Sequence, residues 1–116
     1  MPHFLYAFRA PRDYQPGSTD GTNAWNEWFT ELGSRVVDVG NPVFTATSAG
    51  ETGAGTALGG YSLIAADSLE QAAALAHGCP LVGIGGGVEV GEITPLSELN
   101  LTTTVADHAR RTGIAG

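Results

Sequence analysis

The stretch from residue 59 to residue 93 constrains the fold most, because it contains a complete strand–helix–strand unit with marked ends. Apolar residues alternate over 61–66, which is the period of a strand. A capping box opened by Ser68 predicts a helix over 69–77, which a glycine and a proline then end. Alternation over 87–93 predicts the closing strand of the unit.

The first part of the chain has the same order. Residues 3–9 are apolar almost throughout, which predicts a strand covered on both faces. A helix is predicted over 22–32, because four large apolar residues stand at i, i+3, i+4 and i+7: Trp25, Trp28, Phe29 and Leu32. Asp20 or Thr22 can cap its start, and Gly33 can supply the left-handed turn after its end.

A second strand is predicted to follow in two pieces. Residues 35–39 begin it, and the Gly-Asn-Pro sequence at 40–42 interrupts it, because proline removes a ladder donor and glycine permits a bulge. The strand is predicted to resume over 43–47. Residues 49–60 carry many glycines and predict a flexible connection to the strand over 61–66.

The order β-α-β-β-α-β predicts an α+β domain of the ferredoxin-like class, with an antiparallel four-stranded sheet and both helices on one face. Phe4, Tyr6 and Phe8 share one face of the first strand, and His3, Leu5, Ala7 and Arg9 share the other. Apolar residues on the face without helices need a partner, so we predict a homodimer in which two sheets enclose a dimeric α/β barrel. The domain is predicted to span residues 1–96, followed by a tail, 97–116, with a short helix near 105–111.

Composition excludes several classes of function. The net charge is −7 and the chain has five arginines and no lysine, which argues against nucleic acid as a partner. No apolar run approaches the roughly 20 residues that span a bilayer, and no secretory signal is apparent, so we predict no membrane partner and a cytoplasmic protein. A single cysteine, Cys79, fits a reducing compartment and favours an inert buried thiol.

Neither a metal nor a cofactor is expected. The three histidines show no ligand spacing, and one cysteine cannot complete a thiolate site. The triple glycine at 85–87 precedes a strand, whereas a dinucleotide-binding loop needs a helix at that place.

Four segments together resemble the YCII-related family of the dimeric α/β-barrel superfamily. They are WNEWF at 25–29, VVDVGNPV at 36–43, GGYSLIAADSLEQAAALAHGCP at 59–80 and GGGVEVGEI at 85–93, and the resemblance covers roughly residues 3–96. It implies a ferredoxin-like subunit, a dimer built by sheet-to-sheet packing, and a cleft beside each sheet. Some branches carry a His–Asp pair with the histidine early in the first helix. This chain has Asn23-Ala24-Trp25-Asn26 there, so that pair does not carry over.

Three residues are candidates for acid–base catalysis. Asp38 stands beside the interruption of the second strand, and bulges often border sites. Glu89 lies on a strand next to that of Arg9, where charge is costly unless it is paired, so the two either form a salt bridge or line a polar cleft. His3 begins the first strand and either faces the cleft or is solvated.

The candidates for ligand binding are mostly aromatic. Tyr6, Trp25 and Tyr61 suit a flat molecule, with core packing as the structural alternative, and Arg9 and Asn41 supply polar contacts. We therefore predict a dimeric domain that binds a small organic molecule in a cleft between the helices and the sheet. The alternatives are a cofactor-independent enzyme of lyase, isomerase or oxygenase type that uses Asp38, Glu89 or His3, and a structural or regulatory partner protein without a ligand.

Overall fold

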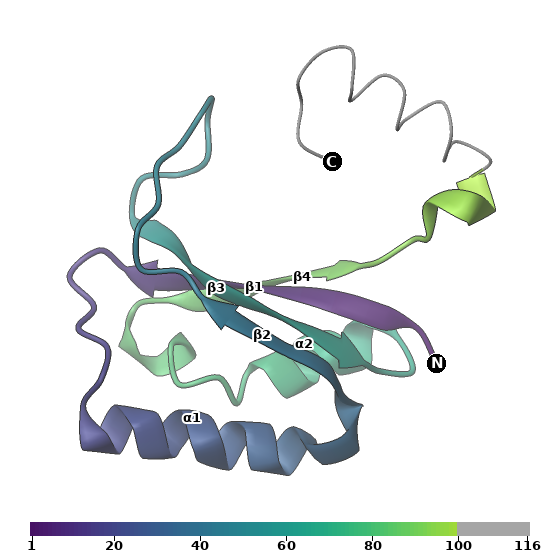
Figure 1. The fold of residues 1–116 in the computed structure, drawn as a ribbon, viewed down its shortest axis with the longest axis horizontal. Helices are drawn as coiled ribbons and strands as arrows, with labels where there is room; N and C mark the ends of the chain where they lie inside the picture. Colours follow the sequence, from purple (N-terminus) through teal and green to yellow (C-terminus); the bar gives the residue numbers. More distant parts are fainter. Residues whose placement is uncertain (100–116) are drawn as a thin grey trace.

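The computed structural model describes residues 1–99, and the helix expected near 105–111 lies outside them. The elements are β1 (His3–Pro11), α1 (Thr19–Leu32), β2 (Val36–Pro42), β3 (Thr56–Ala65), α2 (Leu69–Ala76) and β4 (Gly87–Glu92), with short 3-10 turns at Gly33–Arg35, Val82–Ile84 and Leu96–Leu99. The four strands form one antiparallel sheet in the order β2-β3-β1-β4 (Figure 1). The order of elements and the sheet fit a ferredoxin-like fold, as the sequence predicts.

Both helices lie on the same side of the sheet (Figure 1). The burial of β1 therefore alternates: Phe4, Tyr6 and Phe8 are buried beneath the helices. On the opposite face Leu5 keeps 39% of its surface exposed. Within one chain, β1 is therefore covered on one face only. The sequence predicts that both of its faces are covered, so the second face would need another molecule to cover it.

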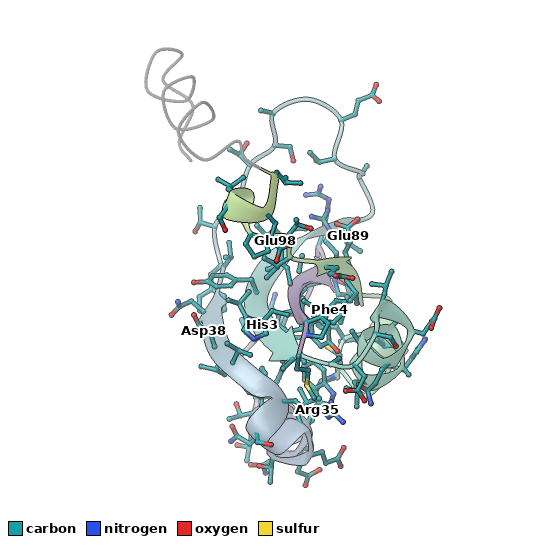
Figure 2. The ribbon with its side chains drawn as sticks, turned by 90° about the vertical axis from the view of Figure 1, so that its right-hand side faces the viewer. His3, Phe4, Arg35, Asp38, Glu89 and Glu98 are labelled. Carbon is teal, nitrogen blue, oxygen red and sulfur yellow. The ribbon has the colours of Figure 1, made fainter. Side chains whose placement is uncertain are left out.

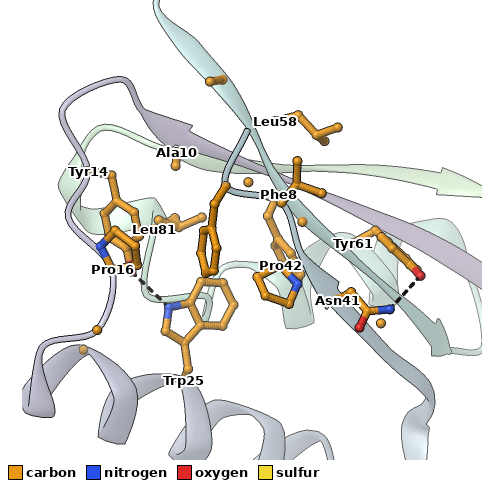
Figure 3. Close-up of a pocket in the computed structure, with 18 of the residues that line it drawn as sticks. Phe8, Ala10, Tyr14, Pro16, Trp25, Asn41, Pro42, Leu58, Tyr61 and Leu81 are labelled. Carbon is orange, nitrogen blue, oxygen red and sulfur yellow. Dashed lines mark hydrogen bonds between the residues drawn. The ribbon is translucent and has the colours of Figure 1, made fainter. Parts of the chain in front are cut away.

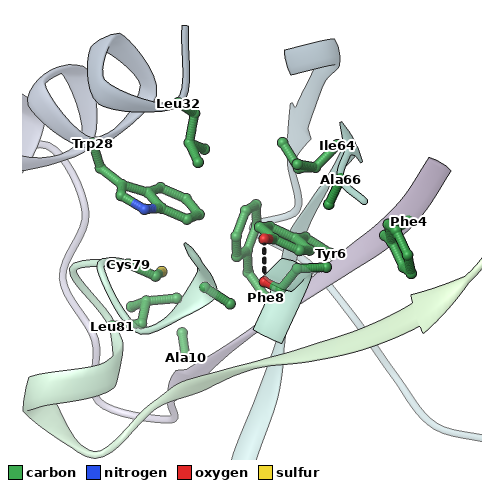
Figure 4. Packing of buried hydrophobic residues seen from close by; sticks show 12 residues of the cluster. Phe4, Tyr6, Phe8, Ala10, Trp28, Leu32, Ile64, Ala66, Cys79 and Leu81 are labelled. Carbon is green, nitrogen blue, oxygen red and sulfur yellow. Dashed lines mark hydrogen bonds between the residues drawn. The ribbon is translucent and has the colours of Figure 1, made fainter. Parts of the chain in front are cut away.

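The buried core lies between the helices and the sheet (Figure 4). Tyr6 stacks on Trp28 with ring centroids 6.0 Å apart, and its hydroxyl donates a hydrogen bond of 2.5 Å to the Ala72 carbonyl. Ala72 and Ala76 form the buried side of α2, and these small side chains let the helix approach the sheet closely. Trp28 is 4% exposed and donates from Nε1 to the Leu75 carbonyl.

The ends of the helices follow from local hydrogen bonds. α1 starts at Thr19, three residues before the predicted start, because the side chain of Ser18 caps it by accepting from the Gly21 N–H. Neither Asp20 nor Thr22 is the cap. Gly33 follows the last residue of α1 with a positive φ of 56°, but its ψ of −125° differs from that of the expected left-handed turn. Ser68 caps α2 through the Gln71 N–H, as expected.

The connection between β2 and β3 differs from the prediction. Residues 43–47 form no strand, since β2 ends at Pro42, which pairs with Gly60. β3 begins at Thr56 instead of 61, because its first residues pair with the end of β1, where Pro11 opposes Thr56. The first residues of β3 therefore extend past the end of β2 and have β1 alone as a strand neighbour.

Candidate ligand-binding cavity

A cavity of about 620 Å³ lies where β2 ends, between the first turns of α1 and the start of β3 (Figure 3). The departure of the chain from the sheet after Pro42 leaves this edge of β3 open, and the segments before α1 and after β2 wall the space. Its lining residues come from six segments: Phe8 and Ala10; Pro11, Arg12, Tyr14, Pro16 and Gly17; Gly21, Thr22, Trp25, Asn26 and Phe29; Val39 to Phe44; Ala57 to Tyr61; and Leu81.

Aromatic rings in fixed contact form the wall on the helix side. Trp25 packs edge-on against Phe8 at 5.1 Å between ring centroids and stacks on Phe29 at 5.9 Å. The indole Nε1 of Trp25 donates to the Tyr14 hydroxyl at 3.3 Å, which ties the loop before α1 to the helix (Figure 3). Trp25 is half-buried, so part of its ring remains available to a ligand.

Phe44 also lines the cavity, but unlike Trp25 it is largely exposed. It stands two residues after the end of β2 and is 75% exposed. It therefore contributes apolar surface at the mouth of the cavity, whereas Trp25 is held inside by its neighbours.

The polar groups of the lining are few. Asn41 donates from Nδ2 to the Tyr61 hydroxyl at 3.1 Å, and this pair lies on the wall made by β2 and β3 (Figure 3). Arg12 donates from Nε to the Ala54 carbonyl at 2.5 Å. Among residues 1–99, Arg12 is the one charged residue of the lining. The lining contains no carboxylate and no imidazole in this range.

The structure places three of the predicted ligand-binding residues, Trp25, Asn41 and Tyr61, in the lining of this cavity. It places Tyr6 elsewhere. Tyr6 is fully buried in the core, and its hydroxyl is occupied by the Ala72 carbonyl. Burial raises the pKa of Tyr6 to about 12, so its phenol stays protonated at neutral pH.

Arg9 lies on the sheet face opposite the helices and binds the start of β3. It donates from Nη2 to the Thr56 carbonyl at 3.0 Å and from Nε to the Thr56 hydroxyl at 3.2 Å. β1 and β4 are neighbours, as expected, and Glu89 opposes Ala7 in their register. The hydrogen bonds of Arg9 nevertheless run to β3 and to the connection before it, and not to Glu89.

The three acid–base candidates lie outside the cavity lining and come from three different strands (Figure 2). His3 and the position opposite Glu89 are four residues apart on β1, which corresponds to roughly 13 Å of strand. Asp38 lies on β2, where its carboxylate accepts from the Gly40 N–H at 2.8 Å. The structure does not bring these residues together around one reacting atom.

Several lining residues were missed from the sequence. Tyr14 stands in an irregular loop, Leu81 follows α2, and Phe44 fell within a segment predicted as strand. None of them belongs to a periodic pattern. The aromatic stripe of α1, by contrast, is periodic, and Trp25 lies at its edge while Trp28 lies in its buried centre.

Cys79 is buried, and burial raises the pKa of its thiol to about 11. The thiol is therefore protonated at neutral pH, which fits the inert cysteine expected from the sequence. Residues 1–99 contain no group of three His, Cys, Asp or Glu side chains placed to hold a metal ion. No helix in the same range has the length and apolar character needed to cross a membrane.

Comparisons with known proteins support the fold. No family model matches the chain, and no curated protein matches it. A solved structure that does match is 5-chloro-2-hydroxyhydroquinone dehydrochlorinase from Burkholderia phenoliruptrix AC1100, in complex with 2,5-dihydroxybenzoquinone. The two chains share 20% sequence identity at a TM-score of 0.52, and the match covers 81% of this chain and 94% of that one. At this identity the likeness shows a common fold.

Proposed function

We propose that this protein is a dimeric, YCII-like domain of the cytoplasm that binds a small, flat aromatic molecule in the cavity beside α1. The observation that carries the proposal is the wall of Trp25, Phe8 and Phe29, whose rings hold one another in place around a space of about 620 Å³. That volume lies within the range of roughly 300–1,000 Å³ typical of small-molecule sites.

The rings are positioned before any ligand arrives. Trp25 contacts Phe8, Phe29 and the Tyr14 hydroxyl, so its orientation does not have to be fixed on binding. Preorganised aromatic surface favours a planar ligand, because stacked or edge-on ring pairs contribute about 0.5–1.5 kcal/mol beyond the burial of apolar area. The Asn41–Tyr61 pair offers hydrogen bonds to oxygen substituents on such a ring.

The structural neighbour is consistent with this class of ligand. It acts on a chlorinated hydroxyhydroquinone and was solved with a dihydroxybenzoquinone, both of which are six-membered carbon rings with oxygen substituents. The identity between the chains supports no transfer of its reaction, so we extend to this protein only the shape and chemistry of the ligand.

An enzyme of lyase, isomerase or oxygenase type is the alternative, and the same neighbour is the observation that favours it. The geometry gives it less support than binding alone. Asp38, Glu89 and His3 lie outside the cavity lining, and within residues 1–99 the lining has no carboxylate or imidazole to move a proton. If a substrate is identified, unchanged turnover in Asp38→Asn and Glu89→Gln would remove these carboxylates as catalysts.

The binding proposal is tested by filling the cavity. Thr22 lies on the first turns of α1 and lines the cavity, whereas its neighbour Asn23 is exposed on the same helix and does not. Thr22→Trp is expected to weaken the binding of flat aromatic compounds at least tenfold in calorimetric titrations. Asn23→Trp, the matched control, is expected to bind like the unaltered protein.

Equal binding in both variants would place the site elsewhere. The absence of heat or thermal stabilisation with any aromatic compound at millimolar concentration would contradict the proposed function.

The dimer is proposed from the uncovered face of the sheet. Leu5 and its partner on β3, Leu63, stay partly exposed there because the two helices cover the opposite face. Exposed apolar residues gathered on one sheet face mark an interface more often than a free surface. A second copy of the same chain covers such a face symmetrically.

Sedimentation velocity tests this part of the proposal. We expect a dimer at micromolar concentration and a monomer after Leu5→Glu, which places a charge on the uncovered face. Leu69→Glu is the control, because Leu69 is 49% exposed at the start of α2, on the helix side of the sheet. A monomeric unaltered protein, or dissociation by both variants, would contradict a dimer through the sheet.

A further inference from the structure

We infer that the ligand of this cavity is an aromatic anion, a planar ring that carries a carboxylate or phenolate oxygen placed at Arg12. The inference rests on the proposed function and narrows it to one chemical class. It follows from the charges around the cavity, from the position of the Arg12 guanidinium and from the apolar character of the remaining wall.

The charge of the cavity lining is opposite in sign to the net charge of the protein. The whole chain has twelve acidic residues against five arginines. Among the described residues of the lining, however, Arg12 is the charged one, and the rest are apolar, glycine or neutral polar residues. An anion that approaches the protein therefore meets a cation at this cavity, while most of the charge it meets elsewhere is repulsive.

The position of Arg12 suits a ligand at the rim. It follows the last residue of β1, and the next turn is closed by a hydrogen bond from the Tyr14 N–H to the Pro11 carbonyl at 2.9 Å. The bond from its Nε to the Ala54 carbonyl holds the guanidinium between this turn and the connection that precedes β3. Within residues 1–99, that bond uses one of the five N–H donors of the group.

The two terminal nitrogens of Arg12 thus remain able to bind an oxygen anion in the two-pronged geometry that arginine forms with carboxylates. The Asn41–Tyr61 pair also lines the cavity and can hydrogen-bond a neutral oxygen substituent. Trp25 lines the same cavity and offers aromatic surface to the ring. The arrangement selects a molecule that is apolar in its middle and anionic at one end.

Arg12 is exposed, so solvent and salt weaken its attraction for a ligand. We therefore expect a preference of about fivefold to tenfold for an anion over a neutral molecule of the same shape, which lies at or below the lower end of the range for hydrogen bonds to charged groups.

The test compares 2-naphthoate with 2-naphthamide by isothermal titration calorimetry at neutral pH and low salt. These probes have the same ring and nearly the same shape, and differ in charge. The unaltered protein is expected to bind the anion about fivefold to tenfold more tightly. Arg12→Gln is expected to remove this preference while the affinity for the neutral amide stays within about twofold.

Arg35→Gln is the matched control, since it changes the net charge equally at a position outside the lining, where Arg35 contacts Gln71. It is expected to keep the preference for the anion. If both probes bind equally well to the unaltered protein, or if Arg12→Gln keeps the preference, the inference is wrong and the aromatic-binding function stands. If neither probe binds at millimolar concentration, the proposed function fails together with the inference.

Discussion

The layer between the helices and the sheet has a packed half and an open half, and the same aromatic stripe of α1 serves both. In the packed half, Trp28 lies on Tyr6 beneath α2 and is 4% exposed. In the open half, one turn earlier on α1, Trp25 borders a cavity of about 620 Å³. The two indoles are neighbours, with ring centroids 5.8 Å apart.

The difference comes from what covers each indole. α2 presents Ala72 and Ala76, whose small side chains bring a helix backbone close enough to accept a hydrogen bond from Tyr6. Residues 43–55, which follow β2, form neither a helix nor a strand. These residues and the loop before α1 border a cavity instead of filling the space beside Trp25. One amphipathic helix thus borders both a packed core and an open cavity, because α2 covers only part of its length.

The two tryptophans should differ most in their contribution to stability. Trp28→Ala leaves a large cavity in the packed half and is expected to lower the free energy of unfolding by about 3–5 kcal/mol. Trp25→Ala removes a half-buried ring that already faces an empty space, and is expected to cost about 1–2 kcal/mol. Urea denaturation of both variants measures the difference. Equal losses would mean that the two halves are packed alike.

Gly40 tests the edge where the cavity begins. Its φ is 72°, and a Cβ atom built there would lie 1.8 Å from the Tyr61 carbonyl oxygen. Gly40→Ala is therefore expected to lower the free energy of unfolding by about 2 kcal/mol, by forcing β2 away from β3. Gly17→Ala is a control with similar φ strain but no nearby atoms. If Gly40→Ala lowers the free energy of unfolding no more than Gly17→Ala does, β2 can move away from β3 at little cost, and the close contact at Gly40 does not constrain this edge.

The hydrogen bond of Tyr6 tests whether the packed half affects the cavity. Tyr6→Phe leaves the buried Ala72 carbonyl without its donor and is expected to cost about 1 kcal/mol. The affinity for aromatic ligands should not change, because Tyr6 does not line the cavity. Weaker ligand binding in this variant would show that the two halves are coupled.

The same residue gives a pH dependence. Burial raises the pKa of Tyr6 to about 12 in the folded protein, above the value near 10 of an unfolded tyrosine. The unfolded chain therefore loses this proton first, and the stability from Tyr6 is complete below about pH 10 and declines as the pH rises toward 12. Urea denaturation across this range should show a steeper decline in the unaltered protein than in Tyr6→Phe. Parallel curves would mean that Tyr6 titrates alike in both states.

Much of the packed half could be predicted from the sequence. The period of strands and helices gave the β-α-β-β-α-β order, and the buried face of β1 follows from the alternation of Phe4, Tyr6 and Phe8. Gly33 and Ser68 mark the helix ends where their chemistry predicts. These features depend on local sequence, so the sequence specifies them.

The open half was harder to predict because it depends on chain segments without a period. The sequence placed a strand over 43–47, but the chain leaves the sheet after Pro42. Thr56 begins β3 five residues earlier than predicted, through pairing with β1 that the glycines of the connection obscure. Trp25 could be chosen as a rim residue, whereas Tyr14 and Leu81 could not, since tertiary packing alone brings them to the cavity.

The most direct test of a ligand-binding open half uses the two indole N–H groups as separate reporters. In a ¹⁵N-labelled sample, Trp25 and Trp28 each give one indole signal, assigned with Trp25→Phe. On titration with 2-naphthoate, the signal of Trp25 should shift strongly and that of Trp28, whose N–H is bound to the Leu75 carbonyl, only slightly. A larger shift at Trp28, or no shift at either indole at saturating ligand, would contradict a binding site in the cavity beside α1.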